Sequence, residues 1–299
     1  SPTVANGLTA NALADDAFTN NTSAPLNVVY TVVPVGDNGC LGNPFTVTAT
    51  INPEPVVANQ LKPICSDAPL GISFNPSTSI AAATYNITAI TQNGLVASAG
   101  NPATGNGLSA NVIADDAFTN NTNAAVNVVY TVVPVSADGC QGNPFTLTVT
   151  VNPEPIVADQ TRTVCSDAPV GVNFNSSTSV AATTYNVTAL DLNGLTVSAG
   201  GAAVANGLSA AALADDAFTN NTIAPVNVIY TVVPVSAAPN SCQGNPFTIT
   251  VTVNPEPVGI PSTPSVCSDQ PFSFNPQNNI NTGGNSVAST FTWVVTSIS

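Results

Sequence analysis

The sequence has no histidine, no methionine and only two basic residues, Lys62 and Arg162, among 299 residues. The absence of histidine removes the commonest general base and the commonest protein metal ligand. Sixteen acidic residues give a formal charge of −14, whereas nucleic-acid binding needs a basic face that displaces counterions from phosphates. We therefore expect no nucleic-acid partner, and no attraction to an anionic membrane surface.

Long apolar runs are also missing from the sequence. No stretch approaches the roughly 18 consecutive apolar residues that a membrane helix needs, because the apolar residues alternate with Thr and Asn. We expect no membrane span in this segment. Charged residues make up only 6 %, yet hydrophobic residues reach 43 %, which is enough to build a core.

The sequence repeats itself with a period of 100 residues. Three blocks recur in three copies: Ala-Asp-Asp-Ala-Phe-Thr-Asn-Asn-Thr at 14–22, 114–122 and 214–222; Gly-Asn-Pro-Phe-Thr at 42–46, 142–146 and 244–248; and Asn-Pro-Glu-Pro at 52–55, 152–155 and 254–257. Such a long period is typical of a string of separate domains rather than of a solenoid.

The Asn-Pro-Glu-Pro block predicts the domain boundaries, because two prolines fix φ and remove backbone donors, so a strand cannot continue through them. We expect two complete repeats, 57–156 and 157–257, flanked by the C-terminal part of a repeat, 1–56, and the N-terminal part of a further one, 258–299. The incomplete ends and the missing initial methionine predict a piece of a longer chain. The alternative is that the incomplete repeats of different chains complete each other.

Each repeat carries the pattern of β-strands. Residues 145–151 alternate strictly between apolar residues and Thr, which predicts a strand with one buried side. Residues 126–134 alternate in the same way, and the turn formers at 137–143 predict a hairpin. A short strand is expected at 71–75 and another at 84–90. About seven short strands per repeat predict an all-β fold of tandem immunoglobulin-like β-sandwich domains, joined as an extended rod.

Four motifs carry a resemblance to a known family. They are Cys-Ser-Asp at 65–67, 165–167 and 267–269, Phe-Thr-Trp at 291–293, Tyr-Thr-Val-Val-Pro at 30–34, 130–134 and 230–234, and Gly-Cys-x-Gly-Asn-Pro-Phe-Thr followed by Val-Asn-Pro. Together they resemble the PKD-like or Ig-like repeats of very large cell-surface proteins of gliding and related Bacteroidetes. The resemblance implies β-sandwich repeats, export by the type IX secretion system and a role in a gliding-motility adhesin. Trp293 departs from the complete repeats, which have Ile87 and Val187 at its position.

Two cysteines per repeat are expected to form disulfides, because turn cysteines of a secreted-type chain favour bridges. They are Cys40, Cys65, Cys140, Cys165, Cys242 and Cys267. Pairing within repeats would join Cys65 to Cys140 and Cys165 to Cys242, and would leave the first and last cysteines with partners outside this sequence.

Pairing across the joints would instead give 40–65, 140–165 and 242–267. A bridge needs Cα atoms within about 7 Å, whereas an eleven-residue strand would hold Cys40 roughly 35 Å from Cys65. The pairing within repeats is therefore favoured, on condition that Cys65 lies beside the hairpin turn.

Three acidic pairs are the most site-like residues: Asp15 and Asp16, Asp115 and Asp116, and Asp215 and Asp216. One interpretation is a calcium site, since carboxylate and amide oxygens suit that ion. The other is a solvated strand end and turn, in which Asp and Asn accept from local backbone donors. The spacing does not match an EF-hand loop.

No activated nucleophile and no carboxylate pair across a cleft can be recognised, so we expect no catalytic residue and no cofactor other than calcium. The sequence favours a structural stalk segment of a long repetitive bacterial adhesin or filament, located extracellularly on the cell surface. Adjacent repeats of the same long chain are the expected partners, and other surface proteins are further candidates. Two alternatives stay open. The repeats themselves bind glycans or proteins, or the chain is a subunit of a head-to-tail surface filament.

Overall fold

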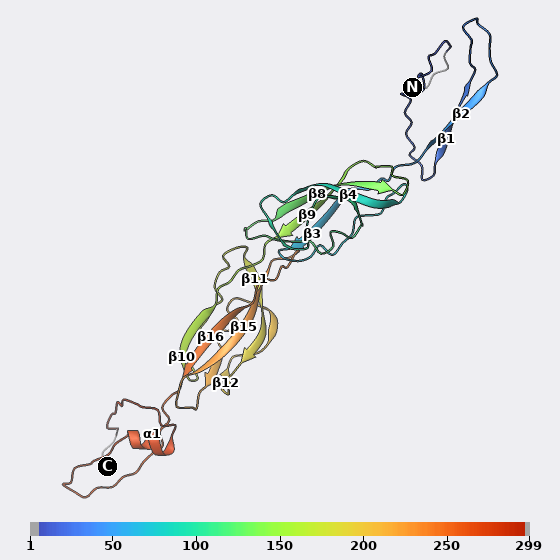
Figure 1. Cartoon of the computed structure of the whole chain (residues 1–299). Helices are drawn as coiled ribbons and strands as arrows, with labels where there is room; N and C mark the ends of the chain where they lie inside the picture. Colours follow the sequence, from blue (N-terminus) through green and yellow to red (C-terminus); the bar gives the residue numbers. More distant parts are fainter. Residues whose placement is uncertain (1–5, 297–299) are drawn as a thin grey trace. The chain divides into compact units, whose positions relative to one another are not determined.

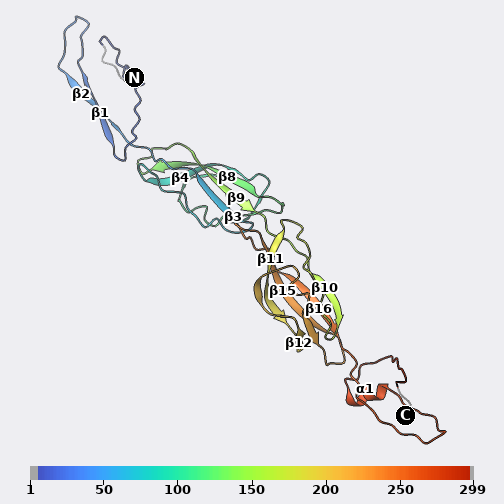
Figure 2. The same ribbon diagram turned by 180° about the vertical axis from the view of Figure 1, so that it is seen from behind.

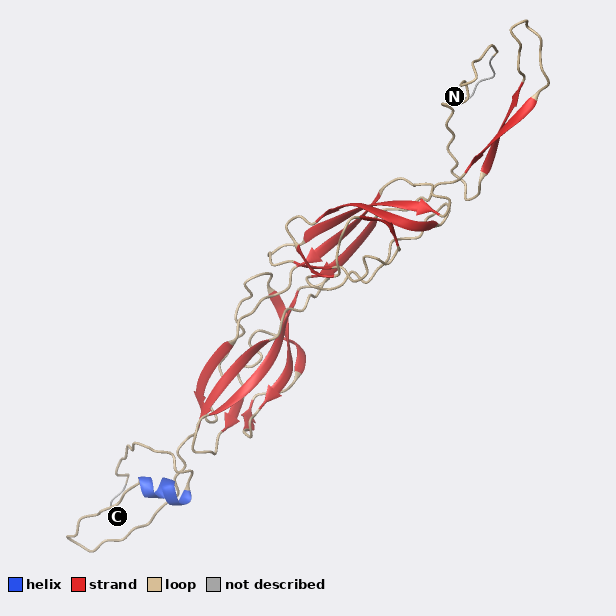
Figure 3. Cartoon of the chain, viewed as in Figure 1, coloured by secondary structure: helices blue, strands red, loops and turns tan. Residues whose placement is uncertain are grey.

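The computed structural model describes residues 6–296 and divides into two compact units, which are treated separately. The expected outer boundaries at Ser1 and Ser299 lie outside the described residues. Sixteen strands and one short helix, α1, are the regular elements of the described part (Figure 3). The prediction of an all-β fold built from tandem sandwich repeats is confirmed. No helix in the described part has the length and apolarity to cross a membrane.

The first complete repeat contains seven strands. They are β3 (Gln60–Cys65), β4 (Ala82–Thr91), β5 (Val96–Ala99), β6 (Gly105–Leu108), β7 (Ala117–Thr119), β8 (Val126–Ser136) and β9 (Phe145–Asn152). The labels β3, β4, β8 and β9 mark the place of this repeat in Figure 1. Five of them form one sheet in the order β3-β9-β8-β4-β6, and β5 pairs with β7 in the second sheet. The first strand, β3, runs parallel to the last, β9, and all other pairs are antiparallel.

The second complete repeat has the same topology (Figure 2). Its strands are β10 (Gln160–Cys165), β11 (Ala182–Asp191), β12 (Thr196–Ala199), β13 (Ala205–Leu208), β14 (Ala217–Thr219), β15 (Val226–Ser236) and β16 (Phe247–Asn254). The sheet orders are β10-β16-β15-β11-β13 and β12-β14, again with the first strand parallel to the last.

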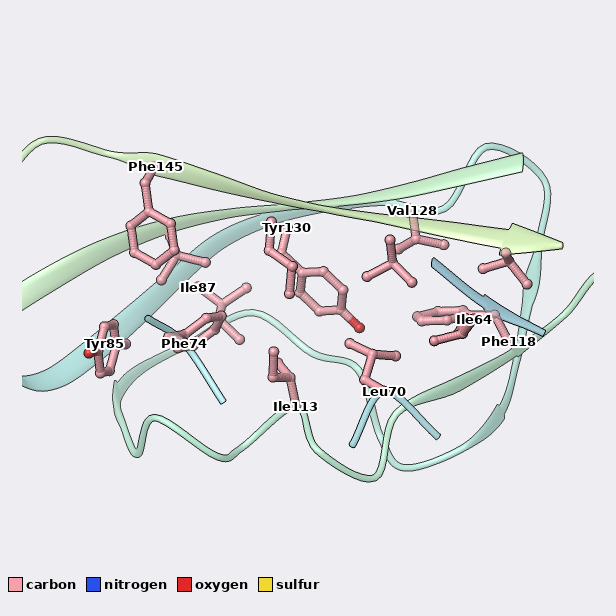
Figure 4. Packing of buried hydrophobic residues seen from close by; sticks show 14 of the residues in the cluster. Ile64, Leu70, Phe74, Tyr85, Ile87, Ile113, Phe118, Val128, Tyr130 and Phe145 are labelled. Atoms are coloured by element: carbon pink, nitrogen blue, oxygen red, sulfur yellow. The ribbon is translucent and has the colours of Figure 1, made fainter. Parts of the chain in front are cut away.

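The alternating pattern sends one side of the β8–β9 hairpin into the core. Tyr130 lies opposite Leu147, and Val132 lies opposite Phe145. These four side chains are at most 2 % exposed. Figure 4 shows Tyr130 and Phe145 on one side of the core, with Leu70 and Ile113 on the other. The apolar cluster of this repeat runs from Val57 to Val151, and that of the second repeat from Val157 to Val253.

The short strand expected at 71–75 is absent as a strand, although Phe74 is buried as the pattern indicated. Its segment is extended and bonds instead to a series of tight turns over 109–116, with Gly71 donating to Ala114 and Phe74 to Ala110. Turn residues expose only scattered carbonyls, so no continuous ladder can form against them.

The two incomplete repeats contain few regular elements. Strands β1 (Leu26–Val32) and β2 (Phe45–Ile51) form a two-stranded antiparallel sheet. Within the described residues 258–296, the only regular element is helix α1 (Gln277–Gly283). The boundaries at 56, 156 and 257 stay predictions.

Gly142 packs closely against the chain that enters its own repeat. A Cβ added there would lie 1.9 Å from the carbonyl oxygen of Pro55, and at Gly244 a Cβ would lie 1.9 Å from that of Pro155. A backbone oxygen cannot move away as a side chain can, so the Gly-Asn-Pro-Phe-Thr block needs glycine here.

We predict that Gly142→Ala lowers the stability of its repeat by about 1–3 kcal/mol, the usual cost of forcing extra volume into a packed site. Urea unfolding would measure the loss. Gly105→Ala is the matched control, because its Cβ would meet nothing closer than Leu108 Cδ1 at 3.4 Å. Equal midpoints for both variants would contradict the proposed steric role.

Candidate functional site: the buried junction of each repeat

The Cys-Ser-Asp motif and the Asp-Asp-Ala-Phe-Thr-Asn-Asn-Thr block contact each other inside each complete repeat. In the first repeat the residues that join them, here called the junction, are Ser66, Asp67, Asp116, Thr119, Asn120 and Tyr130. Ser66 and Asp67 follow β3, Asp116 precedes β7, and Tyr130 lies in β8. The junction therefore connects the start of the repeat to its middle and to its last hairpin.

The hydroxyl of Tyr130 donates to Asp116 Oδ2 at 2.7 Å. Tyr130 is fully buried and Asp116 is 2 % exposed. In Figure 4 the Tyr130 ring extends across the core, with its oxygen directed toward Leu70. The backbone carbonyl of Asp116 also accepts from the N–H of Leu70 at 2.9 Å. One residue thus holds a strand of the main sheet and the chain that follows β3.

Burial raises the pKa of the Asp116 carboxyl, and the nearby Asp115 adds to the rise. The hydrogen bonds from Tyr130 and from the backbone N–H of Asn101 act in the opposite direction, but do not cancel it. Burial also raises the pKa of Tyr130, and its bond to Asp116 raises it further. The tyrosine therefore stays protonated and acts as the donor.

Asp67 occupies the left-handed backbone region, with φ of 60°, where Asp and Asn are tolerated better than most residues. Its backbone N–H donates to Phe118 O at 2.9 Å, and its Oδ1 accepts from Thr119 Oγ1 at 2.5 Å. Partial burial raises the pKa of Asp67, but the hydrogen bonds from Thr119, Ser98 and Ser66 outweigh it and leave the pKa below 3.8. The ionised carboxylate is the form that these donors stabilise.

Asn120 completes the junction with a buried backbone contact and a buried amide. Its N–H donates to Ser66 Oγ at 2.9 Å, and its side-chain Nδ2 donates to Val151 O at 2.7 Å. The second bond reaches the last strand, β9. The Asn-x-Thr sequence at 120–122 therefore has a structural role, because its asparagine links the chain after β7 to Ser66 and to β9.

The other copies repeat this arrangement. In the second repeat Tyr230 donates to Asp216 at 2.7 Å, Thr219 donates to Asp167 at 2.6 Å, and the N–H of Asn220 donates to Ser166 at 2.9 Å. In the incomplete repeat, Tyr30 donates to Asp16 at 2.8 Å.

The structure separates the members of each acidic pair. Asp15, Asp115 and Asp215 are exposed, whereas Asp116 and Asp216 are buried and already accept from tyrosine. Within residues 6–296 no group of three or more His, Cys, Asp or Glu side chains is placed to hold a metal ion. A calcium site at these pairs stays a prediction. The observed bonds also differ from the alternative of a solvated turn with local backbone donors, because Asp116 and Asp216 are buried and accept from tyrosine hydroxyls 14 residues away.

The cysteines do not follow the favoured pairing. Cys65 lies opposite Asn152 at the end of β9, whereas Cys140 lies in the turn before β9 begins. The eight residues of β9 separate these positions by roughly 23 Å, far beyond the reach of a bridge. The condition that Cys65 lies beside the hairpin turn is thus not met, because β3 runs parallel to β9.

The state of each cysteine agrees with this geometry. Cys65 and Cys242 are disulfide-bonded. Free thiols are found at Cys40, Cys140, Cys165 and Cys267. Neither the pairing within repeats nor the pairing across joints is therefore present in the structure.

Sequence reasoning missed Gly100, which allows Asp116 to turn inward. Its φ is +70°, and an added Cβ would lie 2.5 Å from Asp116 Oδ1. It also missed the roles of Ser66 and Tyr130. The available signal was the identical recurrence of their motifs in three copies, which indicates shared contacts but does not say which block contacts which.

Three comparisons place the chain among known proteins. A family model described as a PKD-like domain matches residues 3–55, 62–155 and 162–257. No curated protein matches the chain. Among solved structures, the chicken CNTN1 FN1-FN3 domains share 14 % identity at a TM-score of 0.32, covering 76 % of this chain and 77 % of that one.

Two further structures show similar values. Mouse clustered PcdhgC3 EC1-3 has 12 % identity and a TM-score of 0.26, with coverage of 79 % and 78 % of the two chains. The fibronectin(III)-like modules of CbhA from Clostridium thermocellum have 11 % identity and a TM-score of 0.29, with coverage of 67 % of this chain and 91 % of that one.

We predict that Tyr130→Phe destabilises the first repeat by about 1–3 kcal/mol at neutral pH, because it removes the hydroxyl donor from a buried carboxylate. Loss of that donor raises the pKa of Asp116 further, so the deficit shrinks as the pH falls and the carboxyl protonates. Urea unfolding at several pH values would measure both effects.

Tyr85→Phe is the matched control for this variant. The hydroxyl of Tyr85 makes only a 3.5 Å contact, to Asn75 O. Its loss is expected to change the free energy of unfolding little at any pH. A Tyr130→Phe deficit that is no larger than this control would refute the role given to the buried bond.

For Asp67 and Asp167 we predict a pH dependence of stability opposite to that of Asp116. Their pKa values are lowered in the folded state, so the stability they contribute is present above the unfolded value and is lost as the pH falls. The double variant Asp67→Asn, Asp167→Asn keeps a residue that tolerates the left-handed backbone. It should unfold more easily at neutral pH and lose less of its remaining stability below about pH 4. Parallel pH curves for the variant and the wild type would contradict this assignment.

Proposed function

The chain belongs to the PKD-like domain family, and we propose that its repeats are load-bearing spacer domains in the stalk of a large extracellular adhesin. The function is mechanical. Each repeat passes tension to the next and keeps its fold while doing so. The partners of a repeat are the adjacent repeats of the same chain, and the proposal gives no residue a catalytic role.

The parallel pairing of the first and last strands carries this proposal. Gln60 lies opposite Leu147 and Cys65 lies opposite Asn152. Tension on the two ends of the repeat would pull the start of β3 and the end of β9 in opposite directions along their common axis. All hydrogen bonds of the pair are then loaded together, in shear, instead of breaking one after another. The second repeat has the same register between β10 and β16.

The junction supports the same role, because it fastens both sides of the loaded pair. The side chain of Asn152, at the end of β9, donates to Ile64 O in β3, and the N–H of Ser66 donates to Asn152 O. Asn120 holds β9 one residue earlier, through Val151 O. Slippage of β3 along β9 would therefore break the junction as well as the ladder.

The proposed setting is the surface of a gliding or related Bacteroidetes cell, reached by type IX secretion. The motifs around the cysteines, the Tyr-Thr-Val-Val-Pro strands and the Pro-rich joints support it by resemblance. Disulfide-bonded cysteines suit an oxidising, extracellular location. The net charge of −14 would keep neighbouring stalks soluble and apart.

Single-molecule pulling in two directions tests the load-bearing role. Handles at Gln60 and Asn152 load the β3–β9 pair in shear, whereas handles at Gln60 and Thr146 peel the same pair open from one end. We predict a several-fold higher unfolding force in the first geometry, because the same bonds must break together. The same domain serves as its own control, since only the attachment point changes.

Equal unfolding forces in both geometries would contradict the proposed mechanical role. They would favour a repeat whose role is to bind a glycan or protein partner, for which no direction of force matters. Equal thermal midpoints of the two handled proteins would first show that attachment leaves the fold unchanged.

A further inference from the structure

The chain that enters the first complete repeat is built into the repeat before its first strand begins. Pro55 and Val57 are buried, whereas Glu54 and Val56 are exposed. Such alternation is that of an extended strand with one buried side. Residues 54–59, here called the entry segment, nevertheless lie before β3 and outside its ladder. Other contacts must therefore hold the backbone of this segment.

Two serine hydroxyls and one amide hold the backbone of the entry segment. The N–H of Val56 donates to Ser77 Oγ at 2.8 Å and to Ser79 Oγ at 3.0 Å. Ser79 Oγ donates in turn to Glu54 O at 2.5 Å. The N–H of Thr78 donates to Val56 O at 2.8 Å. Ser77, Thr78 and Ser79 are here called the entry clamp, because they bind backbone groups on both sides of Pro55.

The entry segment also contacts the chain that leads into β9. The N–H of Thr146 donates to Asn59 Oδ1 at 2.8 Å, and Pro55 O lies against Gly142. Both contacts join residues 87 positions apart, which is the offset of the whole β3–β9 register. The entry segment therefore continues the parallel register of β3 beyond the end of the ladder.

The second complete repeat has the same two sets of contacts. The N–H of Ile156 donates to Ser177 Oγ at 2.9 Å, and Ser179 Oγ donates to Glu154 O. The contact with the chain that leads into β16 recurs through Asp159 Oδ1 at 2.6 Å, again with the offset of the parallel register.

A different side chain makes the clamp contacts after the second repeat. Asn285 Nδ2 donates to Glu256 O at 2.5 Å, and Asn285 Oδ1 accepts from the N–H of Val258 at 3.0 Å. In the repeat these two backbone groups correspond to the carbonyl of Glu54 and the N–H of Val56. The same groups are thus bound even where an amide takes the place of the serines.

We propose that the entry clamp bears tension, and that tension enters each repeat at Glu54 and its counterpart Glu154, upstream of the first strand. The proposal rests on the mechanical function proposed above. Because the entry segment continues the register of the β3–β9 pair, a pull on it moves it along the chain before β9 in the same direction as β3. Its hydrogen bonds are then loaded together with those of the ladder. The Asn-Pro-Glu-Pro and Gly-Asn-Pro-Phe-Thr blocks recur because they are the two sides of this contact.

Single-molecule pulling of the full chain from two attachment points tests this role. Handles at Pro53 and Asn152 load the entry segment and the ladder together, whereas handles at Gln60 and Asn152 load the ladder without the entry segment. We expect a higher unfolding force from the Pro53 attachment, because more bonds must break together. Equal forces from the two attachments would overturn the proposal, and this comparison needs no variant.

The double variant Ser77→Ala, Ser79→Ala assigns the difference to the clamp. From the Pro53 attachment its unfolding force should fall toward the value measured from Gln60. From the Gln60 attachment its unfolding force should equal that of the wild type, since the clamp is not loaded there. A general loss of stability would lower both forces by the same fraction, and that result would overturn the assignment.

Ser109→Ala is the matched control, because its hydroxyl donates to Asn111 Oδ1 instead of to the entry segment. It should leave both forces unchanged, and a loss as large as that of the double variant would contradict the role of the clamp. The test is separate from the comparison of shear with peeling, since both attachments of that comparison begin at Gln60. Equal forces there would reject the mechanical function itself, whereas equal forces here would reject only the share of the entry segment.

Discussion

The buried hydrogen bond between Tyr130 and Asp116 is the constraint on which the repeat depends. A carboxylate out of reach of water must keep its partners, because an unsatisfied buried charge costs far more than a satisfied one gains. Asp116 therefore fixes the position of β8 through the tyrosine and that of the chain after β3 through Leu70. Burial of this carboxylate also explains the glycine at position 100, since a Cβ there would clash with Asp116 Oδ1.

The recurrence of two of the motifs is explained by the contact that they make with each other in the junction. Cys-Ser-Asp supplies a left-handed turn whose donors and acceptors face the Asp-Asp-Ala-Phe-Thr-Asn-Asn-Thr block, and that block reaches β9 through Asn120. The junction thus closes the repeat at the end where β3 and β9 lie side by side. A fold fastened there is suited to tension along its first and last strands, and this links the local chemistry to the proposed function.

Much of the fold could be predicted from local patterns, and the exceptions have a physical reason. The alternation at 145–151 and the turn formers before it identified β9 and its hairpin. This was possible because the side chains that face the core are every second residue of one short segment. The parallel pairing of β3 with β9 joins residues nearly 90 positions apart, and no local pattern reports it. The favoured cysteine pairing failed for that reason. The acidic pairs attracted a metal hypothesis because composition does not tell an exposed carboxylate from one that a tyrosine holds inside the core.

Native-state amide hydrogen exchange of the first complete repeat tests the central claim most directly. The N–H groups of Asp67, Leu70 and Asn120 donate to Phe118 O, Asp116 O and Ser66 Oγ across the junction. If the junction holds the repeat together, these amides exchange only through global unfolding, at the same free energy as those in the centre of β8 and β9. Exchange through a low-energy local opening, while the β8 and β9 amides stay protected, would contradict the account.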